Sequence, residues 1–229
     1  MLPGARQFFG RRGGGGGWQN PYVTDGLVAM WDGEWNAGGG VHDDAPSEIA
    51  DIVGSSPLTI SNTYYVEIGS RYFQPDASHG GTTVNLTTDV LKNALDANSA
   101  TIEICASFAS IQNGEWFSVD DATRLYNSAG LCPYWLRVGG SLANVSSLSQ
   151  SLDTLVTIAI RIGGGGSAIF LNGVSQFAIS KGTSIIPVGI RVARNMIGMR
   201  VHCFRISTAL TDAQIAANYS VDQQRFNLP

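Results

Sequence analysis

Apolar and polar residues alternate along two segments in the middle of the chain, and this alternation constrains the fold more than any other feature. In TIEICASF, residues 101–108, every second residue from Ile102 onward is apolar. In LVTIAIRI, residues 155–162, the same is true from Val156 onward. A period of two places such residues on one face of a β-strand. We therefore predict two strands, each with one face in a hydrophobic core.

A hairpin and many further short strands are predicted around these two segments. In AIFLNGVSQF, the dipeptide Asn172-Gly173 separates two apolar runs, and both residues of a two-residue hairpin turn need a positive φ. Segment 89–97 is expected to be a helical turn or a short crossing loop. So many short strands predict an all-β sandwich of two antiparallel sheets. The other expected strands are 27–31, 58–61, 72–74, 116–119, 124–126, 134–138, 190–193 and 201–206.

The end of the chain, STALTDAQIAANYSVDQQRFNLP, predicts a helix instead. Thr211 and Gln214 have the spacing of a capping box, and Leu210 and Ile215 have that of a hydrophobic staple. The apolar face of this helix is narrow, and Asp222 interrupts it. We expect this face to lie on another part of the protein. Its apolar residues are Ile215, Tyr219 and Phe226.

Composition restricts the classes of partner. The chain has 229 residues, of which 44% are hydrophobic, so it is long enough to bury a substantial core as one domain. Its net charge of −4 indicates no nucleic-acid surface. Its longest apolar runs, such as 27–31, are far shorter than the ~20 residues of a membrane span. No secretory signal is recognisable, so we expect synthesis in the cytoplasm.

Residues 1–17 form a basic, glycine-rich arm that precedes a predicted domain at 18–229. Five consecutive glycines give the arm the composition of a linker. It is either a disordered tail or an arm that docks into a larger assembly. The residues that would dock are Arg6, Phe8, Phe9, Arg11 and Arg12.

Three cysteines are present, and none belongs to a CxxC pair. Cys105 and Cys203 lie within expected strands, where buried reduced thiols are typical, whereas Cys132 lies beside a turn-prone segment. An odd number of cysteines without zinc-type spacing predicts neither a disulfide framework nor a zinc site.

Two kinds of residue are candidates for ligand binding. The pairs Asp43-Asp44 and Asp120-Asp121 either bind Ca²⁺ weakly or form solvated turns, and no other cofactor is expected. Four aromatic residues lie close together in a region of adjacent strands, where each either stacks on a sugar ring or packs in the core. Of the two tryptophans we expect Trp135 to be exposed. The four aromatic residues are Trp116, Tyr126, Tyr134 and Trp135.

The order of several motifs resembles a known superfamily. DGLVAMWD, TIEICASF, TLVTIAIRI, AIFLNGV, MRVHCFRIS and ALTDAQIAANYSVDQQRF follow one another as in the concanavalin A-like lectin/glucanase superfamily, in its LamG-like form. More narrowly, the chain is similar to LamG-like modules of phage and prophage tail or fibre proteins, from Asp25 to Phe226. The resemblance implies a concanavalin A-like jelly-roll sandwich with a short C-terminal helix. That helix would pack across the sandwich near its edge, with Ile215 and Tyr219 pointing in.

The resemblance also implies a function. It suggests a non-enzymatic module that binds a cell-surface glycan or other virion subunits, with homo-oligomers as one form of assembly, exposed on a virion or cell surface. The enzymes of the superfamily place two or three acidic residues on one strand, and no such pattern is present in this sequence. The alternatives are a glycoside hydrolase with a carboxylate pair of another pattern and a structural virion module without affinity for glycans.

Overall fold

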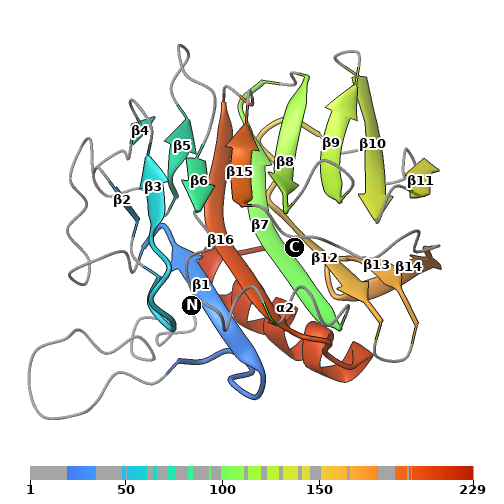
Figure 1. The fold of residues 1–229 in the computed structure, drawn as a ribbon. Coiled ribbons are helices and arrows are strands. Elements are labelled where there is room, and N and C mark those ends of the chain that lie inside the picture. The colour runs from blue at the N-terminus through green and yellow to red at the C-terminus, as the bar shows by residue number, and fades with distance from the viewer. Residues whose placement is uncertain are drawn as a thin grey trace, which may run out of the picture.

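The computed structural model of the chain describes residues 20–34, 48–49, 51–60, 64–65, 72–75, 82–84, 93, 99–110, 113–119, 123–128, 131–138, 141–144, 151–163, 166–179, 189–194, 196 and 198–228. Within these residues, two antiparallel β-sheets face each other and a helix, α2 (Asp212–Phe226), lies against one of them (Figure 1). The arm of residues 1–17 and most of segment 89–97 lie outside them.

The strand order confirms the predicted all-β sandwich. Four short elements, β2, β4, β6 and β11, were not expected, because two to four residues are too few to show a period. The six-stranded sheet has the order β1 (Leu27–Asp32), β16 (Met199–Thr208), β7 (Ala100–Phe108), β12 (Val156–Ile162), β13 (Ala168–Leu171) and β14 (Val174–Ala178). The eight-stranded sheet has the order β11 (Ser141–Asn144), β10 (Leu131–Val138), β9 (Arg124–Ser128), β8 (Gly114–Ser118), β15 (Ile190–Arg194), β6 (Thr82–Val84), β3 (Leu58–Ile60) and β2 (Glu48–Ile49). A separate pair joins β4 (Tyr64–Tyr65) to β5 (Gln74–Pro75).

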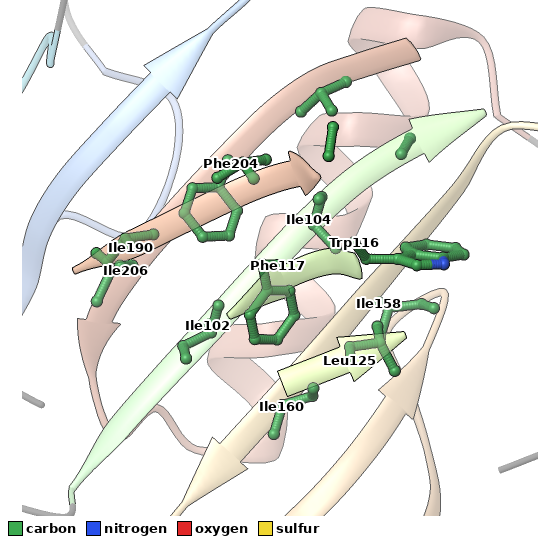
Figure 2. Close-up of a cluster of buried hydrophobic side chains, with 14 of the residues drawn as sticks. Ile102, Ile104, Trp116, Phe117, Leu125, Ile158, Ile160, Ile190, Phe204 and Ile206 are labelled. Carbon is green, nitrogen blue, oxygen red and sulfur yellow. The ribbon is translucent and has the colours of Figure 1, made fainter. Parts of the chain in front are cut away.

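The hydrophobic core fills the space between the two sheets. Figure 2 shows isoleucines of β7 and β12 and Phe204 of β16 facing side chains of the eight-stranded sheet. Phe204 stacks on Trp31 with ring centroids 5.4 Å apart and meets Phe117 at 5.9 Å. The alternation in the sequence therefore identified the correct core face. The core residues drawn from the eight-stranded sheet include Trp116, Phe117, Leu125 and Ile190.

The six-stranded sheet is buried on both faces, which corrects the expectation of a single core face for each strand. All nine residues of β7 and all seven of β12 are buried. Thr101, Glu103 and Thr157 lie on the face away from the core, where α2 and the segment before β1 cover them. Polar residues on this face are therefore not a solvent-exposed surface.

The predicted hairpin and helix start are both confirmed. Asn172 and Gly173 connect β13 to β14 with φ values of 50° and 75°. A side chain on Gly173 would also meet Tyr219 of α2, because its Cβ would lie 3.0 Å from the Cβ of Tyr219. The Thr211–Gln214 capping box is present, and Leu210 and Ile215 pack in one buried cluster.

A buried set of charged and polar residues fastens α2 to the sheet. Asp222 accepts two hydrogen bonds from the guanidinium of Arg205 in β16, at 2.8 and 2.9 Å. It also accepts one from the hydroxyl of Tyr22 at 2.7 Å and one from that of Thr157 at 2.9 Å. Asp222 was expected only to interrupt the apolar face, but it is the central contact. Tyr219, expected to point in, is half-buried.

A second arginine, which lies in α2 itself, makes an equivalent contact with the first strand, β1. Arg225 donates to both carboxylate oxygens of Asp32, at 2.6 and 3.0 Å, and to the hydroxyl of Tyr22 at 2.7 Å. Tyr22 thereby joins the two ion pairs, and its ring lies 4.0 Å below the guanidinium of Arg205. Bidentate pairs of this kind fix orientation as well as distance. The helix is therefore fastened at one position on the sheet.

Glu103 is the third carboxylate in this cluster. It accepts from Nε of Arg205 at 3.2 Å and from the amide of Asn218 at 2.8 Å, while its Oε1 has no hydrogen-bond partner among the described residues. Burial raises the pKa of Glu103 above its ordinary value, although Arg205 acts in the opposite direction.

The two thiols on this face confirm the interpretation of the cysteines. Cys105 and Cys203 are directly opposite one another in β7 and β16, and both are free and buried. Burial raises the pKa of each thiol well above its ordinary value, so both are neutral. Cys132 lies in β10, and its side chain is outside the described set.

Replacing Asp222 with Ala should lower the free energy of unfolding by about 3–5 kcal/mol, because Arg205 then keeps a buried charge without its bidentate partner. The matched control is Asp153→Ala, which removes an exposed carboxylate paired with Arg200 and should cost less than about 1 kcal/mol. Chemical denaturation of both variants measures the difference. Equal losses would contradict the central role of Asp222.

Replacing Glu103 with Gln should change how stability depends on pH. The pKa of Glu103 is higher in the folded than in the unfolded chain, so the folded protein holds the proton longer as the pH rises. The free energy of unfolding of the wild type should therefore fall relative to that of Glu103→Gln above a pH of about 4.3. Denaturation across pH 4 to 8 tests this, and a difference that stays constant over that range would count against it.

Candidate functional site

The face of the eight-stranded sheet that points away from the core carries two rows of polar and aromatic residues. Directly opposite residues of an antiparallel pair share one face, and the intervening residues Phe117, Leu125 and Val192 lie in the core. We call the five residues of these rows whose side chains the structure describes the outer-face cluster. The first row, across β15, β8 and β9, is Arg191, Ser118 and Arg124, and the second, across β8 and β9, is Glu115 and Tyr126.

An irregularity in two neighbouring strands makes this arrangement possible. The register of β8 against β9 shifts between Glu115 and Phe117, and Ala193 in β15 has a φ of 55°. Glu115 and Ser118 are three residues apart and nevertheless share the outer face, since the hydroxyl of Ser118 donates to Oε2 of Glu115 at 3.0 Å. A bulge re-aims the side chains around it. Trp116 is consequently turned into the core.

The contacts within the cluster centre on Arg124. Its guanidinium donates to Oε1 of Glu115 at 3.2 Å and lies 4.8 Å from the ring centroid of Tyr126. Its side chain is 28% exposed, whereas that of Glu115 is 11% exposed. The Nε of Arg124 is buried and has no hydrogen-bond partner among the described residues. The cluster thus combines a half-buried aromatic ring, a carboxylate and a guanidinium that retains an unfilled donor.

Of the predicted aromatic residues in β9 and β10, the structure describes the side chain of Tyr126, which lies on the outer face opposite Glu115. Tyr134 and Trp135 lie in β10, and their side chains are outside the described set. Their part in a binding site, and the expected exposure of Trp135, stay predictions.

Trp116 is a core residue, which corrects its inclusion among the ligand-binding candidates. Its side chain has no exposed area, and its ring lies 4.5 Å from that of Phe108. The indole nitrogen donates to the amide oxygen of Asn127 at 3.2 Å, so its polar group is satisfied inside the protein. A ring without exposed surface cannot stack on a sugar.

The remaining predicted sites lie outside the described residues. These are the arm and the acidic pairs Asp43-Asp44 and Asp120-Asp121, so the Ca²⁺ site stays a prediction. Among the residues that the structure describes, no group of three or more His, Cys, Asp or Glu side chains is arranged to hold a metal ion. No helix within the described part of the chain is long and apolar enough to cross a membrane.

Sequence reasoning missed Arg124 and Arg191 on the outer face. A signal was present, because each occurs in an expected strand next to an apolar core residue. That position predicts the outer face of a sheet. What the sequence does not show is that these strands are neighbours, since the register joins β15 to β8 across more than 70 residues.

Comparison with solved structures supports the fold. Trypanosoma rangeli sialidase superposes with a TM-score of 0.64 at 9% identity, covering 87% of this chain and 33% of the sialidase. The receptor-binding domain of botulinum neurotoxin C/D mosaic serotype gives 0.61 at 14% identity, covering 86% of this chain and 51% of that one. A structure of botulinum neurotoxin type C, described as interacting with two ganglioside molecules, gives 0.62 at 11% identity, with 86% and 51% covered.

At these identities the likeness shows a shared β-sandwich fold and nothing finer. This chain spans about a third of the sialidase and about half of the two toxin chains. No protein-family model matches the chain, and no curated protein matches it in sequence.

Trp116→Ala and Tyr126→Ala should lower the free energy of unfolding by different amounts, because Trp116 lies in the core and Tyr126 lies on the outer face. The loss of a fully buried ring should cost about 3–5 kcal/mol of unfolding free energy. Tyr126→Ala, one strand away on the outer face, is the matched control and should cost less than half as much, because its ring is half-buried. Urea denaturation of both variants measures this. Equal costs would mean that Tyr126 is also a core residue.

Proposed function

We propose that the chain is a non-enzymatic carbohydrate-binding module of the LamG-like type, which holds a glycan on the outer-face cluster. The observation that carries the proposal is the half-buried ring of Tyr126 beside the guanidinium of Arg124, which is paired with Glu115. Aromatic rings pack against the apolar faces of sugars, and charged and hydroxyl groups next to them bind sugar hydroxyls. Sugar-binding surfaces need both kinds of group within the width of a few strands.

The solved structures with the same fold agree with a carbohydrate-related role. One is a sialidase that has been solved in complex with sialic acid, and another is a toxin described as interacting with gangliosides. These proteins share the fold of this chain without close sequence similarity, so they support the class of ligand and not its identity.

Binding is favoured over hydrolysis by the contacts of Glu115, the carboxylate of the outer-face cluster. Arg124 and the hydroxyl of Ser118 both bind it, and its strand β8 has no second acidic residue. Glycoside hydrolases use two carboxylates about 5 to 9.5 Å apart. Glycoside hydrolysis is therefore the second candidate.

The setting of the module follows from the sequence resemblance. We place it among the tail, fibre or capsid-associated proteins of phages and prophages, with residues 1–17 as the arm that docks it to other virion subunits and the sandwich exposed for adhesion to a host surface. A virion module without glycan affinity is the structural alternative. Particles purified with and without residues 1–17 distinguish a docking arm from a tail.

Replacing Tyr126 with Ala should weaken retention on immobilised glycans roughly two- to tenfold, because stacking on an aromatic ring contributes about 0.5–1.5 kcal/mol. Val174→Ala is the control, since Val174 is 63% exposed on β14 of the other sheet and should not affect retention. A glycan array with both variants measures binding, and a reducing-sugar assay on the same glycans measures hydrolysis. Equal retention by Tyr126→Ala would place the binding site elsewhere, and sugar release would favour the hydrolase.

A further inference from the structure

Glu103 lies beneath α2, at the point where the helix meets the centre of the six-stranded sheet. Its Oε2 accepts a hydrogen bond from Nε of Arg205 in β16 at 3.2 Å and another from the amide of Asn218 in α2 at 2.8 Å. The side chain of Glu103 comes from β7 and has no exposed area. This carboxyl group is therefore a direct contact between the sheet and the helix that solvent does not reach.

Two carboxyl groups share the guanidinium of Arg205. Both terminal nitrogens of Arg205 donate to Asp222, and only its Nε donates to Glu103. A second buried arginine, Arg225, is held by Asp32 at 2.6 and 3.0 Å. One guanidinium cannot neutralise two ionised carboxylates, and the pKa of one of two carboxyl groups that share a site is raised.

The hydrogen bonds indicate which of the two carboxyl groups this is. Each oxygen of Asp222 accepts one hydrogen bond from Arg205. Each also accepts one from a hydroxyl, which is that of Tyr22 at one oxygen and that of Thr157 at the other. Oε1 of Glu103, by contrast, is buried without a hydrogen-bond partner among the described residues. An ionised carboxylate only accepts hydrogen bonds, so this arrangement favours a charge on Asp222 and a proton on Glu103.

The attachment of α2 to the sheet depends mainly on polar contacts. Only one of the four buried residues of the helix is apolar, and the other three take part in the hydrogen bonds around Glu103 and Asp32. Buried ion pairs contribute little net stability, because desolvation offsets their attraction. A change of charge within this contact therefore alters how often the helix leaves the sheet. The four buried residues are Ile215, Asn218, Asp222 and Arg225.

We propose that the proton of Glu103 sets how firmly α2 is attached to the six-stranded sheet. With the carboxyl protonated the helix rarely opens, and with the carboxyl ionised it opens more often while the sandwich stays folded. The ionised form is disfavoured only in the closed state, because opening brings the carboxylate into water. Opening also exposes the thiols of Cys105 and Cys203, which pack in one cluster with Val221 and Phe226 of α2.

The direction of the pH dependence follows from the position of Glu103. Burial raises the pKa of Glu103, and the charge of Asp222 acts in the same direction, whereas Arg205 lowers it. The pKa is therefore higher with the helix closed than with it open. The attachment is strongest below a pH of about 4.3, the ordinary value of a glutamate, and weakens as the pH rises through the pKa of the closed form.

Other titratable groups also face Glu103 or the helix. Tyr22, Cys105 and Cys203 keep one charge state between pH 4 and pH 8, because burial raises the pKa of each well above its ordinary value. His202 of β16 lies 5.2 Å from the ring of Phe226, and histidines ordinarily titrate near a pH of about 6.5. Glu103→Gln keeps all of these groups, so its difference from the wild type reports Glu103. The charged groups of α2 and its further partners are Asp32, Glu34, Arg161, Asp212, Asp222 and Arg225.

Hydrogen exchange of backbone amides measures the opening of α2. In the wild type, the protection of the α2 amides should fall at least about fivefold from pH 4 to pH 8 after correction for intrinsic exchange, because ionised Oε1 lacks a donor in the closed form. In Glu103→Gln it should change less than about twofold. Asp153→Asn removes an exposed carboxylate paired with Arg200 of β16 and should behave like the wild type. Equal falls in the wild type and Glu103→Gln would overturn the proposal.

The same experiment separates local opening from global unfolding. Exchange of the α2 amides should depend little on low concentrations of urea, whereas exchange of the β7 amides should have the full dependence of global unfolding. Equal urea dependence in both elements would mean that the helix leaves only when the domain unfolds, which would overturn the proposal. Alkylation of Cys105 and Cys203 by N-ethylmaleimide at pH 8 should be faster in the wild type than in Glu103→Gln, and an equal or slower rate would also contradict it.

A second variant keeps the proposal testable if Glu103→Gln does not fold. His202→Gln retains Glu103 and removes the histidine beside Phe226. Its α2 amides should lose protection from pH 4 to pH 8 by the same factor as those of the wild type. Loss of the pH dependence in His202→Gln would assign the effect to His202 and overturn the role of Glu103.

Discussion

The bidentate pair between Arg205 and Asp222 is the interaction on which the rest of the structure depends. It joins the last helix to the centre of the six-stranded sheet, and both side chains are fully buried. Removing two charges from water is expensive, so such a pair contributes little net stability but strongly disfavours any other position of the helix. Tyr22 and Thr157 complete the hydrogen bonds of Asp222, so a displaced helix would leave several buried groups unsatisfied.

Because α2 is attached to the six-stranded sheet, the two sheets differ in what covers their outer faces. The six-stranded sheet is packed against the core on one side and beneath α2 on the other, as Figure 1 shows. The eight-stranded sheet carries its polar rows on the face away from both. The helix thus covers the outer face of the six-stranded sheet, and our proposed glycan site lies on the outer face of the other sheet.

Local sequence patterns predicted the hairpin and the start of the helix correctly. They could not predict contacts between residues that lie far apart in the sequence. Asn172-Gly173 and the Thr211–Gln214 box depend on neighbours within four residues, and both occur as expected. The burial of Glu103 was not predicted, because its partners Arg205 and Asn218 lie 102 and 115 residues away. The narrow apolar face of α2 was interpreted through Tyr219, whereas the fixed contact is Asp222. A charged residue on the apolar face of a helix can either interrupt the packing of that face or form a buried ion pair. Only the identity of its partner decides between the two.

The residues of the candidate site were also difficult to predict, because the site joins strands that are distant in the sequence. Proximity in sequence grouped Trp116 with Tyr126, whereas the structure places Trp116 in the core and Tyr126 on the outer face. Arg124 and Arg191 were not recognised as members of one row, because β15 pairs with β8 although the two strands are distant in the sequence.

The proposed glycan site on the outer face is the central claim. The most direct measurement is the mapping of backbone amide shifts by NMR as a glycan retained on the array is titrated into the protein. The account predicts shifts concentrated in β8, β9, β10 and β15, and shifts confined to the six-stranded sheet and α2 would contradict it.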